Sequence, residues 1–152
     1  MAKKRMHDEH AVEMLTQNTL TLLPLAKKRL LRLDFVQKKY HLPYSHLQVL
    51  ALLESHGSLS VSEVSHRLGI AKPNITPLVD RLYAEGFVSR DHDQHDRRVV
   101  NISLQPEGRE KLTAIKADIA SQLREQVSVL SAADFKELCN ALISMNRILE
   151  LI

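Results

Sequence analysis

Several kinds of residue are scarce in this sequence, and each scarcity excludes a class of protein. The single cysteine, Cys139, excludes an intramolecular disulfide framework and the zinc sites that are built from several cysteines. Tryptophan is absent and aromatic residues make up only 4% of the chain, so a hydrophobic core must be mainly aliphatic. No stretch approaches the roughly 18 apolar residues of a membrane-spanning helix, and the basic opening residues are not followed by the apolar run of a secretion signal. We therefore expect a cytoplasmic protein with no membrane partner.

The sequence also lacks the short motifs of common enzymes. It contains no glycine-rich phosphate-binding loop, no His-Glu-x-x-His and no Gly-x-Ser-x-Gly. Serine, histidine and aspartate residues are present, but no spacing singles out a catalytic group. We expect that the protein is not an enzyme and that it needs no cofactor.

The composition is that of a globular protein, and its charge is unevenly distributed. The 152 residues make about one domain, and 44% of them are apolar. The net charge of +3 arises in the first third, because residues 1–44 carry nine Lys and Arg residues against four Asp and Glu residues. Residues 45–105 and 106–152 each have a net charge of −1. Since a basic excess on a helix is usually a solvated face, the charge alone does not indicate nucleic acid.

The middle of the sequence has the pattern of a helix-turn-helix. The segments "SHLQ" at 45–48 and "SVSE" at 60–63 both resemble capping boxes, in which a serine and a later Glu or Gln stabilise a helix start. The second box predicts a helix of about two turns that ends at Gly69. A further helix is expected over residues 72–85 and ends before Gly86. Two short helices joined by a brief turn with a glycine form a helix-turn-helix.

Two strands are expected directly after these helices. The segment "FVSRD" at 87–91 forms the first, and "VVNISL" at 99–104 alternates apolar and polar residues, which is typical of a strand. The polar segment "HDQHDRR" between them predicts a hairpin loop. A helix-turn-helix followed by a two-stranded hairpin is a winged helix, so the predicted fold class is mainly α with a small β wing.

Long helices are predicted on both sides of the winged helix. The first runs from about His7 to Lys39 and is interrupted at Pro24. A second helix follows the segment "PEG" at 106–108, and "SAAD" at 131–134 caps the last one.

The last helix has an apolar seam of the kind found in coiled coils. Its apolar residues advance by three and four positions: Phe135, Leu138, Leu142, Met145, Leu149 and Ile152. Together with the first helix it carries more apolar surface than one small winged helix can cover, which predicts a homodimer. We expect a winged helix-turn-helix domain in residues 41–105 and dimerisation helices in residues 1–40 and 106–152.

Four segments in matching order make the chain similar to the MarR (multiple antibiotic resistance regulator) family. They are "YSHLQVLALL", "LSVSEVSHRLGIAKPNITPLVDRLYAEGFVSR", "DHDQHDRRVVNISL", which contains the family's Asp-x-Arg as Asp96 and Arg98, and "LQPEGREKL". The segments span about residues 42–113. The resemblance implies a homodimeric winged helix-turn-helix transcriptional regulator, a repressor that binds a palindromic double-stranded DNA operator. It also implies a small effector, often aromatic or phenolic, that releases the DNA.

The resemblance further implies that the helix over 72–85 enters the major groove and that the hairpin at 91–98 reaches the neighbouring minor groove. If the apolar residues of that helix face the core, its outward side chains suit DNA, because Asn pairs with adenine, Lys donates to guanine or phosphate, and Thr offers a hydroxyl and a methyl group. Arginine suits a narrow minor groove, where negative potential is concentrated. The predicted DNA-binding residues are Lys72, Pro73, Asn74, Thr76, Pro77, Arg81, Arg97 and Arg98.

Pro77 is unusual because it lies inside the predicted helix. There the missing N–H and the ring clash cost about 3 kcal/mol. Pro73 and Pro77 share the outward face, so we interpret Pro77 as a determinant of helix shape and DNA specificity. The alternative is that it contacts nothing. In the hairpin, Asp96 brings a negative charge toward DNA, and the family's Asp-x-Arg implies that it orients an arginine.

A metal-responsive regulator of the same family is an alternative. His7 and His10, three residues apart on a helix, and His92 and His95, which lie among aspartates, could hold a metal ion. Solvated polar side chains are the simpler interpretation of both pairs, and we assign no metal site. Cys139 is likewise more simply a small core residue than a redox sensor.

A winged helix that binds protein instead of DNA is the second alternative. Such a surface would be expected to carry apolar or aromatic anchors. The outward side chains of Lys72, Asn74 and Thr76 and the arginine pair of the hairpin argue against it. We therefore expect a DNA-binding protein.

Overall fold

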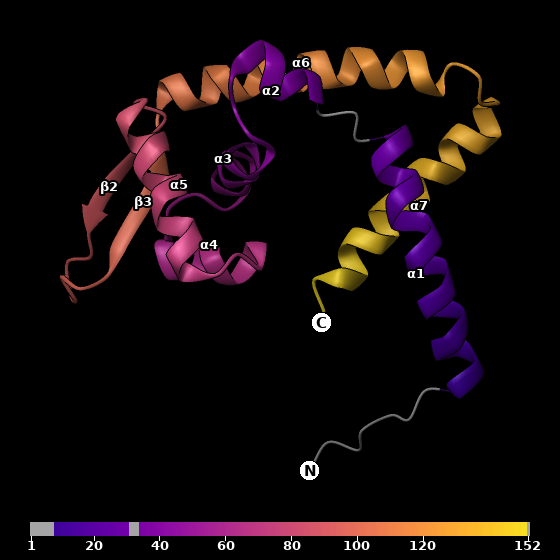
Figure 1. Cartoon of the computed structure of the whole chain (residues 1–152), viewed down its shortest axis with the longest axis horizontal. Helices are drawn as coiled ribbons and strands as arrows, with labels where there is room; N and C mark the ends of the chain where they lie inside the picture. The colour runs from indigo at the N-terminus through magenta and orange to yellow at the C-terminus, as the bar shows by residue number, and fades with distance from the viewer. Residues whose placement is uncertain (1–7, 31–33, 152) are drawn as a thin grey trace. The chain divides into compact units, whose positions relative to one another are not determined.

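The computed structural model describes residues 8–30 and 34–151. The chain divides into two compact units, one formed by residues 33–120 and the other by residues 1–32 with 121–152. We call them the winged-helix unit and the terminal unit. Figure 1 labels the elements, which in chain order are α1 (Glu9–Arg29), α2 (Asp34–Tyr40), α3 (Tyr44–His56), β1 (Leu59–Ser60), α4 (Val61–Leu68), α5 (Lys72–Ala84), β2 (Val88–His92), β3 (Val100–Leu104), α6 (Pro106–Val127) and α7 (Ala132–Leu149).

The winged-helix unit contains the sheet together with α2 to α5 and the first part of α6. Its three strands are antiparallel in the order β1-β3-β2, so β3 lies in the centre. β2 and β3 pair from Val88 opposite Leu104 to His92 opposite Val100 and form the predicted hairpin. The predicted fold class, mainly α with a small β wing, is confirmed. β1 has no signal in the sequence, because two residues are too few to show an alternating pattern.

The core of this unit is aliphatic, as the composition predicts. Each buried side chain of this size contributes about 1.5–3 kcal/mol by leaving water. The inward residues of α5 are among them, which confirms the predicted face of that helix, and two residues of α6 join the same core. The buried apolar residues are Val36, Leu42, Leu47, Val49, Leu50, Leu53, Leu59, Val64, Ile75, Leu78, Val79, Leu82, Val88, Ile102, Leu112 and Ile115.

The predicted ends of α4 are confirmed. Ser60 and Glu63 form the capping box, since the Ser60 Oγ accepts from the Glu63 N–H at 3.2 Å and the Ser60 N–H donates to the Glu63 carboxylate at 2.8 Å. Gly69 ends the helix with φ 62° and ψ 26°, a left-handed conformation that glycine adopts without a steric penalty. α4 therefore leads into α5 through the short turn that a helix-turn-helix needs.

The capping box predicted at residues 45–48 is wrong. α3 begins at Tyr44 after Pro43, so Ser45 lies inside the helix and no side chain caps the start. Pro43 has φ −61° and ψ 152°, and its fixed φ places the N-cap two residues before the serine. The Oγ of Ser45 lies 3.4 Å from Nδ1 of His46 instead.

The predicted interruption at Pro24 is also wrong. α1 continues through Pro24 to Arg29, and the chain leaves the helix at Leu30. An interior proline removes a single backbone hydrogen bond, here the one to the carbonyl of Leu20, and a helix of 21 residues keeps the bonds on both sides of it. Residues 34–40 then form the separate helix α2.

The terminal unit consists of α1, the last part of α6 and α7. The predicted cap at Ser131 is confirmed, because its Oγ accepts from the Asp134 N–H at 3.1 Å. No described residue of α1 or α7 is buried, and a hollow of about 590 Å³ with mainly aliphatic walls lies in this unit. Ile152, the end of the predicted seam, lies outside the described residues. The exposed apolar side chains are Val12, Met14, Leu15, Leu20, Leu22, Leu23, Leu25, Val129, Leu130, Phe135, Leu142, Ile143, Met145, Ile148, Leu149 and Leu151.

Within residues 8–30 and 34–151, none of the helices combines the length and the hydropathy that crossing a membrane requires.

Candidate nucleic-acid interface

The outward face of α5 is accessible along its whole length. While the four apolar residues of the helix are buried, all six residues predicted to face outward are exposed: Lys72, Pro73, Asn74, Thr76, Pro77 and Arg81. The helix starts after Ala71, which has no side-chain cap, and the N–H groups of Asn74 and Ile75 donate to the Ala71 carbonyl at 2.8 and 3.1 Å. Lys72, Asn74 and Thr76 therefore project from the first two turns of a helix whose other face is anchored in the core.

The side chains of this face offer complementary hydrogen-bonding groups. The Asn74 amide has both donors and an acceptor, as the adenine edge in the major groove requires, and Lys72 is a donor for guanine or phosphate. The hydroxyl of Thr76 donates to the Lys72 carbonyl at 3.3 Å, which leaves its lone pairs and its methyl group for a ligand.

Pro77 does not break α5, which continues to Ala84. It lacks the N–H that would donate to the carbonyl of Pro73 four residues earlier, so this acceptor remains free of a helical partner on an exposed face. The cost of the missing bond is tolerated because the buried residues on the opposite face hold the helix on both sides of Pro77.

Arg81 is engaged with the protein itself. Its Nη2 donates to the backbone carbonyl of His41 at 2.8 Å and its Nε donates to Glu85 at 2.9 Å. His41 has φ 53°, a left-handed conformation that is uncommon for a residue other than glycine. Arg81 thus ties α5 to the connection between α2 and α3, although the sequence suggests a DNA contact for it.

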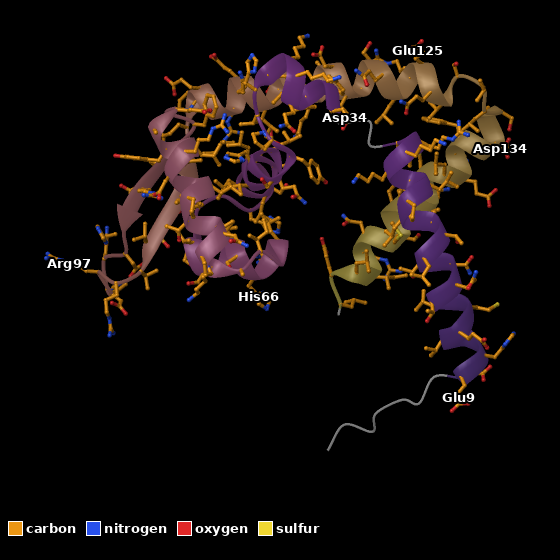
Figure 2. The ribbon with its side chains drawn as sticks, in the orientation of Figure 1. Glu9, Asp34, His66, Arg97, Glu125 and Asp134 are labelled. Carbon is orange, nitrogen blue, oxygen red and sulfur yellow. The ribbon has the colours of Figure 1, made fainter. Side chains whose placement is uncertain are left out.

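The hairpin presents its arginines at its far end. Figure 2 shows the Arg97 side chain at the tip of the β2–β3 hairpin, pointing away from the rest of the winged-helix unit. Arg98 is paired with Asp96, because its Nε and Nη2 donate to the two carboxylate oxygens at 3.1 and 3.2 Å. The Arg98 side chain and backbone N–H together hold the pKa of Asp96 below its ordinary value. This carboxylate therefore stays charged and restricts the orientation of Arg98.

A second aspartate organises the loop between the strands. Asp93 accepts from the N–H groups of His95 and Asp96 at 2.9 and 3.1 Å, and these bonds lower its pKa. Across the loop, Nδ1 of His92 lies 2.8 Å from the Arg97 carbonyl oxygen. The backbone that carries Arg97 is thus fixed by hydrogen bonds within the hairpin.

A groove of about 480 Å³ separates the start of α4 from the hairpin. Polar residues line it, together with three valines: Ser60, Ser62, Thr76, Arg90, His92, Arg98, Val61, Val99 and Val100. The groove therefore brings together the start of α4, Thr76 of the predicted helix face and Arg98 of the predicted hairpin residues.

Arg90 is a residue of this groove that the sequence did not single out. It forms an ion pair with Asp80 of α5, and its guanidinium lies 5.5 Å from the ring centroid of Tyr83. A two-residue alternation places Arg90 on the same strand face as buried Val88, and this is the one sequence signal that could have located it.

His46 is a second residue that the sequence did not single out. It is buried between α3 and α5, with its Nε2 lacking a hydrogen-bond partner among the described residues. Burial is the main cause that lowers its pKa, and the charge of Arg81 adds to it, while Glu85 acts in the opposite direction. The fold therefore disfavours protonation of His46.

The histidine pairs considered as an alternative metal site lie among no larger ligand cluster in the described part of the chain. No group of three or more His, Cys, Asp and Glu side chains is arranged there to hold a metal ion. Nδ1 of His92 lies within hydrogen-bond distance of the Arg97 carbonyl oxygen, and His7 lies outside the described residues. Cys139 is half-buried on α7.

Comparisons with known proteins agree with this geometry. The family model described as "MarR family" matches residues 42–100. The uncharacterized HTH-type transcriptional regulator YfiV of Bacillus subtilis (strain 168) is 30% identical over 112 residues, which are 74% of this chain and 70% of that protein. The HTH-type transcriptional repressor MdtR of the same strain is 36% identical over 87 residues, 57% of this chain and 56% of that protein. These relatives are named as transcriptional regulators, not as enzymes.

A solved structure shows the same fold over nearly the whole length. The structure of a MarR family protein from Bacillus stearothermophilus has a TM-score of 0.75 and 22% sequence identity, and the match covers 95% of this chain and 99% of that one.

Proposed function

The chain belongs to the MarR family of DNA-binding transcriptional regulators, and on that premise we propose that it is a homodimeric repressor of a palindromic operator. The observation that carries the proposal is the arrangement of the winged-helix unit, in which α5 buries its apolar face in the core, exposes its polar face, and packs against the strand β2 of the arginine-tipped hairpin. α5 lies in the major groove and the hairpin reaches the adjacent minor groove.

On α5 the base contacts come from its first two turns. Asn74 pairs with adenine, Lys72 donates to guanine or to a phosphate, and Thr76 contacts a thymine methyl group. Pro73 and Pro77 give this face its shape. We leave Arg81 out of the contact set, because its guanidinium is used by His41 and Glu85.

In the hairpin, Arg97 enters the minor groove. Its exposed position at the tip supports this role, since arginine is attracted to the negative potential of a narrow minor groove. Arg98 is oriented by Asp96 and contacts the sugar-phosphate backbone. Because both arginines neutralise phosphate charge, affinity falls steeply as the salt concentration rises.

Dimerisation is assigned to residues 1–40 and 106–152, and DNA binding to residues 41–105. Proteins of the family bind DNA and function as dimers. The many exposed apolar side chains of α1 and α7 support the assignment, because two helices without a buried residue need a partner surface and a second copy would cover them. Two α5 helices related by a twofold axis then read two half-sites of one palindrome.

The regulator acts in the cytoplasm and is released from DNA by a small molecule, as is typical of the family. Release requires that the effector bind the DNA-incompetent state more tightly than the competent one. The chemical class of the effector follows only from the family, in which aromatic and phenolic molecules are common.

Selection of bound duplexes from a random DNA pool tests the proposal. We expect the wild-type protein to enrich a palindrome whose half-sites lie about one helical turn apart. Asn74→Ala should lose the preference at one position of each half-site, whereas the double variant Arg97→Ala/Arg98→Ala should bind all sequences more weakly and show a shallower salt dependence.

The double variant Arg109→Ala/Arg124→Ala is the matched control, because it removes the same two charges from exposed positions on α6. It should keep the wild-type preference and nearly the wild-type affinity. Failure of the wild-type protein to enrich any sequence, with a shallow salt dependence, would refute the proposal and favour a winged helix that binds protein.

A further inference from the structure

Arg90 connects the hairpin to the helix that the proposed function places in the major groove. It lies on β2 opposite Ile102 of β3, and Ile102 is fully buried. β2 packs against α5, and the hairpin runs beside that helix in Figure 1. The guanidinium of Arg90 pairs with the carboxylate of Asp80 and lies over the ring of Tyr83, 5.5 Å from its centroid.

The two partners of Arg90 stand on one face of α5. Asp80 and Tyr83 are three residues apart and therefore neighbours on the helix surface. A planar guanidinium satisfies both at once, because its edge donates to a carboxylate while its face stacks on an aromatic ring, and the ammonium group of lysine cannot do this. The Arg90 side chain is only 28% exposed, so the contact is more than a solvated surface pair.

The contact of Arg90 with Asp80 and Tyr83 lies on the strand that leads to the tip of the hairpin. His92 follows Arg90 by two residues on the same strand face, and its Nδ1 lies 2.8 Å from the Arg97 carbonyl oxygen. On the other side, Asp80 follows Thr76 by one helical turn. Arg90 and His92 thus lie on the strand that leads to the hairpin tip, and Asp80 lies one helical turn from Thr76 on α5.

We propose that Arg90 is a positioning residue for DNA binding, which locks the hairpin to α5 through Asp80 and Tyr83 and so sets the separation between the major-groove side chains and Arg97. The inference rests on the proposed function, in which both parts contact the same duplex. Both grooves are contacted at once only if this separation matches the spacing of the grooves, so a loose hairpin costs affinity without removing a DNA contact.

A direct contact between Arg90 and a phosphate is the competing explanation, because Arg90 also lines the groove of about 480 Å³. The two explanations make opposite predictions for Asp80→Asn. This change removes a negative charge beside the DNA and frees the guanidinium, so a direct phosphate contact would become stronger. If Arg90 positions the hairpin, binding becomes weaker although the repulsion has decreased.

The test compares wild-type protein with Asp80→Asn and Tyr83→Leu on the operator that the selection yields. We expect each variant to lose about fivefold or more in affinity. Hydroxyl-radical cleavage should show that the minor-groove protection by the hairpin is lost, while methylation of guanine N7 shows that the major-groove protection by α5 persists. Thermal unfolding without DNA checks that the variants are folded.

Glu85→Gln is the matched control, because it removes one negative charge from the same helix without touching the hairpin. It should retain the minor-groove protection. The swapped pair Asp80→Arg/Arg90→Asp should recover part of the protection that Arg90→Asp alone loses, which a direct phosphate contact cannot explain.

Equal or tighter binding of Asp80→Asn with an unchanged footprint would overturn the inference and leave the proposed function intact. Equal loss of protection in both grooves would also overturn it, since a general loss of folding or affinity does not separate the hairpin from α5. If the wild-type protein binds no duplex, the proposed function fails and the inference fails with it.

Discussion

Arg81 of α5 donates from Nη2 to the backbone carbonyl oxygen of His41, 2.8 Å away, across 40 positions of the sequence. The same guanidinium donates to Glu85 at the end of α5, so the side chain joins this helix to the connection between α2 and α3. Arg81 is exposed on the outward side of α5, but its guanidinium is bonded to the protein itself. It therefore stabilises the fold.

Arg81→Ala should therefore lower the stability of the protein. A charge-assisted hydrogen bond to a backbone carbonyl and a half-exposed ion pair together predict a loss of about 1–2 kcal/mol, measured as the free energy of unfolding in urea. Arg97→Ala, which removes an exposed side chain at the hairpin tip, should leave that free energy unchanged and weaken DNA binding. The assignment of Arg81 to the fold would be wrong if the two variants exchanged these effects.

The pairing of Asp96 with Arg98 leads to a second prediction. Asp96→Ala should weaken binding to the operator by about fivefold, because Arg98 loses its orientation, even though a negative charge has been removed near DNA. The measurement is a binding isotherm at fixed salt concentration. Asp91→Ala removes the same charge from an exposed position in the same hairpin and should leave the affinity equal or slightly higher. Tighter binding of the Asp96 variant would contradict an orienting role.

His46 predicts a pH dependence of stability. Its folded-state pKa lies below the ordinary value of 6.5, mainly because of burial. The unfolded chain therefore binds a proton that the folded protein resists, so stability is complete above the unfolded pKa and falls as the pH drops through about 6.5 toward the folded pKa.

Thermal unfolding between about pH 7.5 and 5.5, a range of about one unit on either side of the ordinary histidine pKa, measures this effect. His46→Leu should flatten the dependence, and His46→Gln serves if the leucine variant is poorly folded. His66→Gln is the control, since His66 is exposed on α4. A wild-type pH dependence that persists in both His46 variants would assign it to other groups.

Pro77 predicts a separation between stability and specificity. Pro77→Ala restores an N–H that can donate to the Pro73 carbonyl, which should stabilise α5 by up to about 3 kcal/mol. If the proline determines the shape of the DNA-contacting face, the sequence selected from a random pool should change at the same time. A variant that is more stable and keeps the wild-type operator preference would show that Pro77 contacts nothing.

Much of the fold is visible in the sequence where short-range interactions decide it. Ser60 and Glu63 interact within one turn, Gly69 adopts a conformation suited to its missing side chain, and the apolar spacing of α5 reports which face is buried. Each of these depends on residues within one or two turns, so the pattern and the structure agree. The outward face of α5, and with it most of the candidate site, follows from the same periodicity.

Two predictions from short-range patterns were wrong, one for the start of α3 and one for the course of α1. Ser45 and Gln48 have the spacing of a capping box, but Pro43 already starts the helix two residues earlier. Pro24 has the chemistry of a helix breaker, yet α1 continues through it, because one proline removes a single hydrogen bond from a helix of 21 residues.

By itself the sequence determined α4, α5 and the two strands of the hairpin, the inward face of α5, and a family membership that indicates the class of function. Only the tertiary structure decided that Arg81 holds His41, that Arg90 links the hairpin to Asp80, and that His46 is buried beside α5. The physical reason is the range of the interactions. Periodicity and capping act between residues a few positions apart and leave a trace in the sequence, whereas these contacts form between segments that become neighbours only when the core of the winged-helix unit is packed.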